Sequence, residues 1–149
     1  MTRPQPLILL ATDFSTQAGA AYGAVIDLAR QLDASILLAH VVESSPITPH
    51  GAPLAPVQLP PDMGSLLKTA QRHMAQEIQK LGTVVHVEVA CVPGPDVAHS
   101  LTELAKERGA AFIAISTHGR TGIRRLVLGS IAEAVVRHST VPVICYPSR

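Results

Sequence analysis

The sequence predicts an α/β fold in which an open five-stranded parallel sheet, in the order 3-2-1-4-5, carries helices on both faces. Two observations lead to this fold class. Short apolar runs alternate along the chain with segments whose apolar residues recur at helical spacing, a repetition typical of parallel sheets. The 149 residues, 47% of them hydrophobic and 15% charged, suit a single domain over 1–149 with a proper core.

The first half of the chain contains two apolar strands. LILLA at 7–11 is apolar throughout and ends at Thr12 and Asp13, as expected of a strand that is buried on both faces of a parallel sheet. SILLAHVV at 35–42 has the same character. The expected helices of this half, both inferred from apolar residues at helical spacing, are 18–32 and 63–81, the second of about five turns.

The second half contains three further strands and two helices. VVHVEVA at 84–90 alternates apolar with polar residues, so His86 and Glu88 indicate a strand at one edge of the sheet. AFIAIS at 111–116 is apolar and is expected in the middle, beside the first strand. Helical spacing predicts the two helices over 97–105 and 131–138.

The last strand, VPVICY at 141–146, is expected at the other edge because Pro142 has no N–H to donate to a neighbouring strand. It is nevertheless apolar on both faces, and an exposed apolar edge invites pairing with another chain. We therefore expect a homodimer through 141–146. The alternative is a terminal strand that the helices of its own chain partly cover.

One long segment between the expected elements has no helix or strand pattern. Residues 43–61 hold six prolines, all between 46 and 61. Loops this long within a compact domain are uncommon and often functional. The segment follows the second strand at the ligand-binding end of such sheets, so it is either a flap over a ligand or an insertion without a role.

Composition excludes several function classes. A net charge of +1 provides no bulk field for a polyanion, and two Phe, two Tyr and no Trp provide no stacking platform, so no nucleic-acid partner is expected. The seven histidines and two cysteines show no metal-ligand spacing. The cysteine count and the short N-terminal apolar run predict a cytoplasmic protein without a membrane partner.

Two polar clusters follow neighbouring strands of the predicted sheet. ATD at 11–13 ends the first strand, and STHG at 116–119 ends the fourth. In open parallel sheets, ligands bind beyond the carboxyl ends of the strands where the strand order reverses, so these clusters should face one pocket. Neither a Walker A loop nor a G-x-G-x-x-G dinucleotide motif is present.

The stretch STHGRTGIRRLVLGS at 116–130 suggests how that pocket works. Gly119 and Gly122 allow sharp turns, and Gly129 precedes Ser130, which is expected at or near the cap of the last helix. A helix N-terminus favours phosphate, whereas the ionised Asp13 accepts hydrogen bonds from ribose hydroxyls or an exocyclic amine. The pattern predicts a nucleotide site, with a capped helix after a glycine-rich turn as the alternative.

The spacing Ser116-x2-Gly119-x9-Gly129-Ser130, the opening ILLATDFS and the run LGSIAEAVVRHSTVPV resemble the universal stress protein family over essentially the whole chain. Members of that family carry a G-x2-G-x9-G-[ST] pattern. The resemblance implies a Rossmann-like fold, similar to that of the adenine nucleotide alpha hydrolases, and a homodimer through the last strand. It also implies bound ATP, or AMP or ADP, with Mg²⁺ accompanying the nucleotide.

The resemblance also implies which residues hold the nucleotide. Those residues are Ala11, Thr12, Asp13, Val41, Ser116, His118, Gly119, Arg120, Gly129, Ser130 and Ile131. The first three would line the adenosine, the backbone of Val41 would meet adenine, and the last three with Gly119 would hold the phosphates. Ser116 departs from the pattern, which has glycine there. Its hydroxyl could donate to the sugar, or its Cβ could strain a backbone angle that only glycine adopts.

These residues are compatible with two classes of function. The first is a nucleotide-dependent switch in the stress response that an unknown protein partner reads. The second is a dimeric interaction module of the same fold that binds no nucleotide. Only Asp13, His118 and Glu43 could serve in ATP hydrolysis, and they form no recognisable catalytic arrangement, so at most slow hydrolysis is expected.

Overall fold

The structure is a computed structural model that describes residues 4–44, 62–118 and 128–148. In this part of the chain the elements are β1 (Leu7–Ala11), α1 (Thr16–Gly19), α2 (Tyr22–Leu32), β2 (Ser35–Glu43), α3 (Met63–Leu81), β3 (Val87–Gly94), α4 (Val97–Glu107), β4 (Phe112–Ser116), α5 (Ser130–His138) and β5 (Val143–Tyr146). All four strand pairings are parallel and the order is β3-β2-β1-β4-β5, which confirms the predicted sheet.

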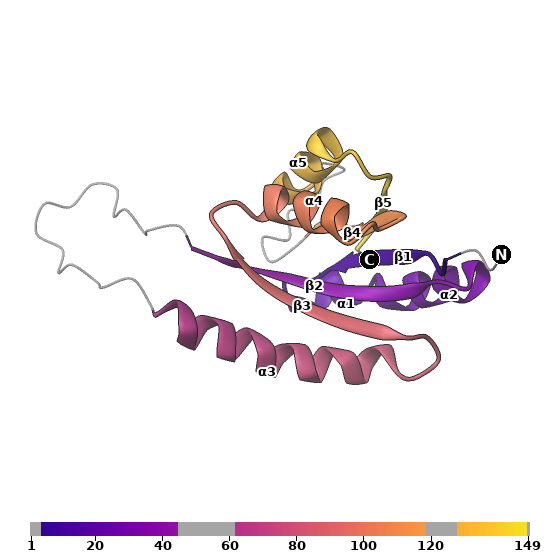
Figure 1. The fold of residues 1–149 in the computed structure, drawn as a ribbon, viewed down its shortest axis with the longest axis horizontal. Helices are drawn as coiled ribbons and strands as arrows, with labels where there is room; N and C mark the ends of the chain where they lie inside the picture. The colour runs from indigo at the N-terminus through magenta and orange to yellow at the C-terminus, as the bar shows by residue number, and fades with distance from the viewer. Residues whose placement is uncertain (1–3, 45–61, 119–127, 149) are drawn as a thin grey trace, which may run out of the picture.

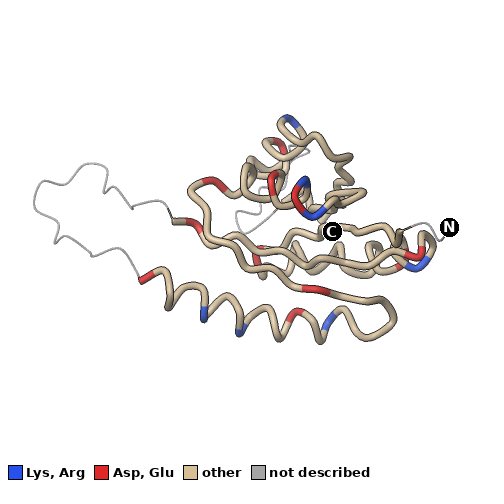
Figure 2. Tube along the Cα trace, in the orientation of Figure 1, with Lys and Arg blue, Asp and Glu red and all other residues tan. Residues whose placement is uncertain are grey.

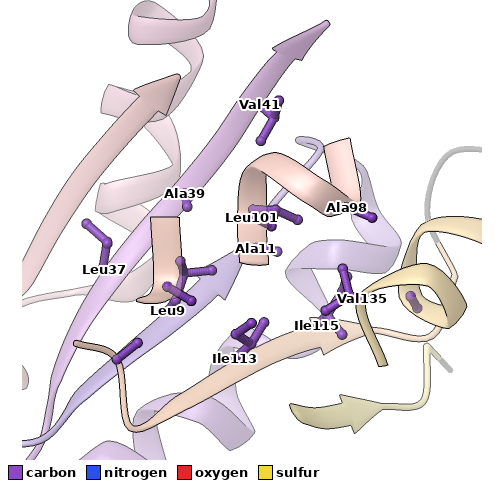
Figure 3. Close-up of a cluster of buried hydrophobic side chains, with 13 residues drawn as sticks. Leu9, Ala11, Leu37, Ala39, Val41, Ala98, Leu101, Ile113, Ile115 and Val135 are labelled. Atoms are coloured by element: carbon purple, nitrogen blue, oxygen red, sulfur yellow. The ribbon is translucent and has the colours of Figure 1, made fainter. Parts of the chain in front are cut away.

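The helices cover both faces of this sheet, as predicted (Figure 1). Successive residues of a strand point to opposite faces. Accordingly Leu9 packs in one cluster with residues of α4 and α5, and Leu10 packs in a second cluster with residues of α2 and α3. Figure 3 shows the first cluster, in which Leu101 of α4 and Val135 of α5 lie over the strands. The carboxyl end of β1 is therefore held between two packed layers.

Several predicted boundaries were wrong. The third strand is Val87–Gly94 rather than 84–90, because it pairs along β2 from Ile36 opposite Val87 to Glu43 opposite Gly94. His86 precedes the strand, although the edge position is confirmed. The first helix is divided, since the Ala21 N–H bonds to the Ala18 carbonyl three residues back.

The last strand begins at Val143 rather than 141, so Pro142 lies just before it and accepts a bond from the Ile113 N–H at 2.9 Å. Its four side chains are half-buried at the sheet edge. Of the proline-rich segment 43–61, Glu43 ends β2, and residues 45–61 lie outside the described residues. Among the described residues, no helix is long and apolar enough to cross a membrane.

Asp62 is the N-cap of α3, the helix that lies along one side of the predicted pocket. Its carboxylate accepts bonds from the Gly64 and Ser65 N–H groups at 3.3 and 3.1 Å, and from the Ser65 hydroxyl at 3.0 Å. These bonds, that of the hydroxyl first, hold the pKa of the carboxyl below its usual value. A lowered folded-state pKa means that the stabilisation is present above the unfolded-state pKa and is lost as pH falls through the folded one.

We therefore expect Asp62→Asn, which caps a helix without titrating, to match the wild-type melting temperature at neutral pH and to exceed it in acid. Thermal unfolding followed by circular dichroism at a series of pH values measures this difference. If the melting temperatures of the two proteins fell equally with pH across the whole acid range, the role assigned to the Asp62 cap would be contradicted.

Candidate functional site

A cavity of about 590 Å³ opens at the carboxyl ends of β1, β2 and β4. Every predicted site residue that the structure describes lines it, namely Ala11, Thr12, Asp13, Val41, Ser116, His118, Gly129, Ser130 and Ile131. Gly119 and Arg120 lie outside the described residues. The topology thus brings together the two clusters that follow β1 and β4, as the position of a switch point predicts.

The turn after β1 is tightly bonded. The Thr12 N–H donates to the Ala39 carbonyl at 2.9 Å, which continues the ladder beyond the strand. One Asp13 carboxylate oxygen accepts from the N–H of Ser15 at 3.0 Å and from its hydroxyl. Ser15 in turn caps α1 by accepting from the Ala18 N–H at 3.1 Å. Asp13 is therefore held at the cavity wall as an acceptor.

Ser116, the departure from the glycine pattern, is compatible with its position. Within the described residues, positive φ at a non-glycine occurs only at Phe14 and Asp33, so the Ser116 backbone needs no glycine-only angle. Ser116 ends β4 in register with Tyr146, and its hydroxyl donates to the His118 carbonyl at 3.1 Å. The strain alternative is thus removed, and the hydroxyl proton is used by the backbone rather than presented to a sugar.

The start of α5 agrees with the prediction that Ser130 lies at or near the helix cap. Gly129, with φ −59° and ψ 152°, is the N-cap, and Ser130 is the first helical residue. A side chain at Gly129 would meet the Thr117 carbonyl oxygen at 2.9 Å, because the Gly129 N–H already donates to that oxygen at 2.7 Å. Ser130 provides no cap bond, and the first N–H groups of a helix have no intrahelical acceptor. These donors border the cavity.

Among the described lining residues, the charged ones are the carboxylates of Asp13 and Glu43. Positive potential in this part of the lining comes from the N-terminus of α5 rather than from a cation. Elsewhere the charges are mixed, and Figure 2 shows Lys or Arg interspersed with Asp or Glu along α3. The arginines of the glycine-rich stretch, at 120, 124 and 125, lie outside the described residues.

His118 contributes an imidazole to the same wall. Its Nδ1 lies 3.1 Å from Thr117 Oγ1 and 3.2 Å from Ser148 Oγ. Its Nε2 is buried and, within the described part of the chain, has no hydrogen-bond partner. A buried nitrogen of this kind costs free energy unless another group satisfies it, so a ligand atom in the cavity could stabilise it.

Sequence reasoning missed the opposite wall. The side chains there include Phe14, His40 and, from the first turns of α3, Leu66, Thr69 and His73. The Phe14 ring packs against His40 with centroids 4.2 Å apart and against His73 edge-on at 5.1 Å. His40 belongs to β2, and His73 is an exposed residue of α3. The spacing i, i+3, i+7 of the three α3 residues was the available signal for a shared face.

The fold and the cavity together define a doubly wound α/β protein whose candidate ligand site lies at the carboxyl edge of a parallel sheet. The model of the universal stress protein family matches residues 7–147, and the chain belongs to that family. The resemblance inferred from the glycine pattern is thereby confirmed.

Individual relatives agree with this assignment. A universal stress protein of Methanocaldococcus jannaschii is 29% identical over 147 residues, covering 92% of this chain and 79% of the relative. Among solved structures, the universal stress protein UspA from Lactobacillus plantarum has a TM-score of 0.75 at 24% identity, covering 97% of this chain and 99% of its own.

Two further solved structures were obtained with nucleotides. The universal stress protein from Archaeoglobus fulgidus in complex with dAMP has a TM-score of 0.67 at 18% identity, with 95% of this chain and 96% of that chain covered. A universal stress protein in complex with cAMP has a TM-score of 0.66 at 17% identity, with 97% and 98% covered. At these identities the likeness shows the shared fold.

Proposed function

We propose that this protein binds an adenine nucleotide, ATP in the first instance, across the carboxyl edge of its sheet and acts as a nucleotide-dependent switch in the stress response. The observation that carries the proposal is a cavity that joins the N-terminus of α5 to the Asp13 turn. One end offers donors for phosphate, and the other offers a carboxylate for hydroxyl or amine groups. The dAMP and cAMP complexes of fold relatives support the same ligand class.

Each part of the nucleotide has a chemically matched set of residues. The N–H groups at Ser130 and Ile131 would hold the phosphates, with Gly119, Arg120 and His118 Nε2, which has no partner among the described residues. Ala11, Thr12 and Asp13 would line the adenosine, and the Val41 backbone would meet adenine. Mg²⁺ would enter with the phosphates, since the described residues contain no cluster of three metal-ligating side chains.

The proposal includes a cytoplasmic location, a protein partner that reads the bound state, and a homodimer through β5. The half-buried apolar side chains of that edge strand support the dimer, because exposed apolar edges are otherwise prone to unwanted pairing. They also support the second candidate function, a dimeric interaction module without nucleotide. Sedimentation equilibrium tests the dimer, and nucleotide titration separates the two functions.

Ser130 gives the sharpest test of nucleotide binding. It is exposed at the first position of α5, where a carboxylate is favourable to the helix dipole yet repels a phosphate. We expect Ser130→Asp to weaken ATP binding about tenfold or more, a loss that corresponds to ~1.4 kcal/mol. The variant should unfold at or above the wild-type temperature. Calorimetric titration and thermal unfolding measure the two effects.

Ser130→Asn is the matched control, because it has the same size without the charge and should bind ATP nearly as the wild type does. If Ser130→Asp and Ser130→Asn weakened ATP binding equally, the site would exclude a larger side chain rather than a negative charge. That result would contradict a phosphate at this position. Absence of binding by the wild type at millimolar ATP, with no nucleotide released on denaturation, would favour the dimeric interaction module.

A further inference from the structure

A carboxylate is buried on the inner face of α3. Glu77 is 4% exposed, and a charge in such a place is tolerated only with close partners. Its Oε2 lies 2.6 Å from the Tyr22 hydroxyl oxygen, and its Oε1 accepts from Lys80 Nζ at 2.5 Å. Tyr22, on α2, is also 4% exposed. Glu77 therefore joins α3 to α2 inside the protein.

The hydrogen bonds continue from Tyr22 to the cavity. The Tyr22 oxygen also lies 2.9 Å from Thr12 Oγ1, and Thr12 Oγ1 accepts from the Phe14 N–H at 3.1 Å. An ionised carboxylate only accepts, and each hydroxyl has one proton. Tyr22 must therefore donate to Glu77, and Thr12 must donate to Tyr22. Burial, followed by donation to Glu77, raises the pKa of Tyr22 well above its ordinary value, in agreement with this direction.

The chain of bonds ends in a strained turn at the cavity wall. Phe14 has φ 65°, a left-handed conformation that costs a non-glycine residue roughly 1 kcal/mol or more and persists only where surrounding contacts impose it. The contacts here are the bond from the Phe14 N–H to Thr12, the ring packing on His40, and a 2.8 Å bond from His40 Nδ1 to the Thr12 carbonyl. Asp13 lies between the two residues that are held.

We propose that Glu77 is a positioning residue for the cavity: through Tyr22 it orients Thr12, and so fixes the turn that presents Asp13 to the ligand. That the ligand is a nucleotide rests on the proposed function. Because Glu77 belongs to α3 and Thr12 to the cavity wall, the packing of α3 and occupancy of the cavity are energetically coupled. Such coupling is reciprocal, so a ligand that orders the turn also stabilises α3.

The test uses two changes in the chain of bonds. A glutamine at 77 can donate as well as accept and no longer dictates the direction, and a phenylalanine at 22 removes the link while keeping the ring. We expect Glu77→Gln and Tyr22→Phe each to raise the dissociation constant of ATP about tenfold. The double variant should have a dissociation constant no higher than that of the weaker-binding single variant, because both changes break the same chain of hydrogen bonds. Asp27→Asn, which removes an exposed helix carboxylate paired with Arg30, is the control and should bind like the wild type.

A second readout does not require nucleotide. In the ¹⁵N-labelled, ligand-free protein, Glu77→Gln and Tyr22→Phe should both shift the amide resonances of Phe14 and Ser15, and Asp27→Asn should leave them in place. Lower melting temperatures with unchanged dissociation constants and unchanged Phe14 and Ser15 resonances would overturn the proposal, since the network would then only anchor α3.

The two proposals fail in different ways. If the wild type binds no nucleotide, the proposed function fails, and the Phe14 and Ser15 amides still decide whether Glu77 positions the turn. If Glu77→Gln does not fold, Tyr22→Phe, which keeps the aromatic packing of the core, decides both readouts. Additive losses of affinity in the double variant would contradict a single chain of bonds.

Discussion

Replacing Leu10 by alanine is expected to lower the free energy of unfolding by about 2 to 5 kcal/mol. Leu10 is fully buried in β1, the central strand, with Leu38 opposite on β2 and Ala114 opposite on β4. The alanine loses the transfer free energy of the side chain and leaves a void. Because β1 is bonded to a neighbour on each side, the backbone cannot move to fill that void.

Urea unfolding, with extrapolation to zero denaturant, measures the effect. Leu32→Ala is the matched control: the same atoms are removed at the last position of α2, where the side chain is 40% exposed, and we expect a loss of less than about 1 kcal/mol. Similar losses at the two positions would mean that the centre of the sheet can repack, against the rigid support that we assign to the Asp13 turn.

The order of the strands could be predicted because the burial of each strand determines its pattern of apolar and polar residues. The runs at β1, β2 and β4 are apolar on both faces, as central parallel strands must be, and Glu88 marks β3 as an edge. The bounds of β3 were harder to predict. They depend on its pairing with β2 up to Glu43, and alternation alone does not define where such a pairing begins.

The candidate site could be predicted as far as topology determines it. Residues that follow β1 and β4 meet because parallel strands end at one edge, and this rule brought Asp13 and Ser130 to one cavity. The wall formed by α3 and the buried Glu77 could not be found in this way. A lone glutamate in an amphipathic helix is typical of an exposed position, and its partner Tyr22 lies 55 residues away along the chain.

Replacing Gly129 by alanine is expected to destabilise the protein by about 1 to 3 kcal/mol, as overpacking does. A smaller effect acts in the opposite direction. Gly129 has φ −59°, which alanine also adopts, so the lower entropy of the unfolded chain alone would stabilise the folded protein by about 0.4 to 1 kcal/mol. The steric term is larger because the new Cβ would lie 2.9 Å from the Thr117 carbonyl oxygen. That oxygen is a backbone atom, and the Thr117 N–H is itself bonded to the Tyr146 carbonyl.

Gly23→Ala provides a control of opposite sign. Gly23 lies in α2, and a Cβ there meets nothing within 4 Å, so alanine should stabilise the protein by about 0.5 to 1 kcal/mol. Denaturant unfolding of the two variants in parallel measures the difference. If Gly129→Ala were also stabilising, the close contact with Thr117 would not be maintained in solution. The glycine would then be retained for the ligand's approach to the start of α5 rather than for packing, and ATP affinity in that variant should fall although stability rises.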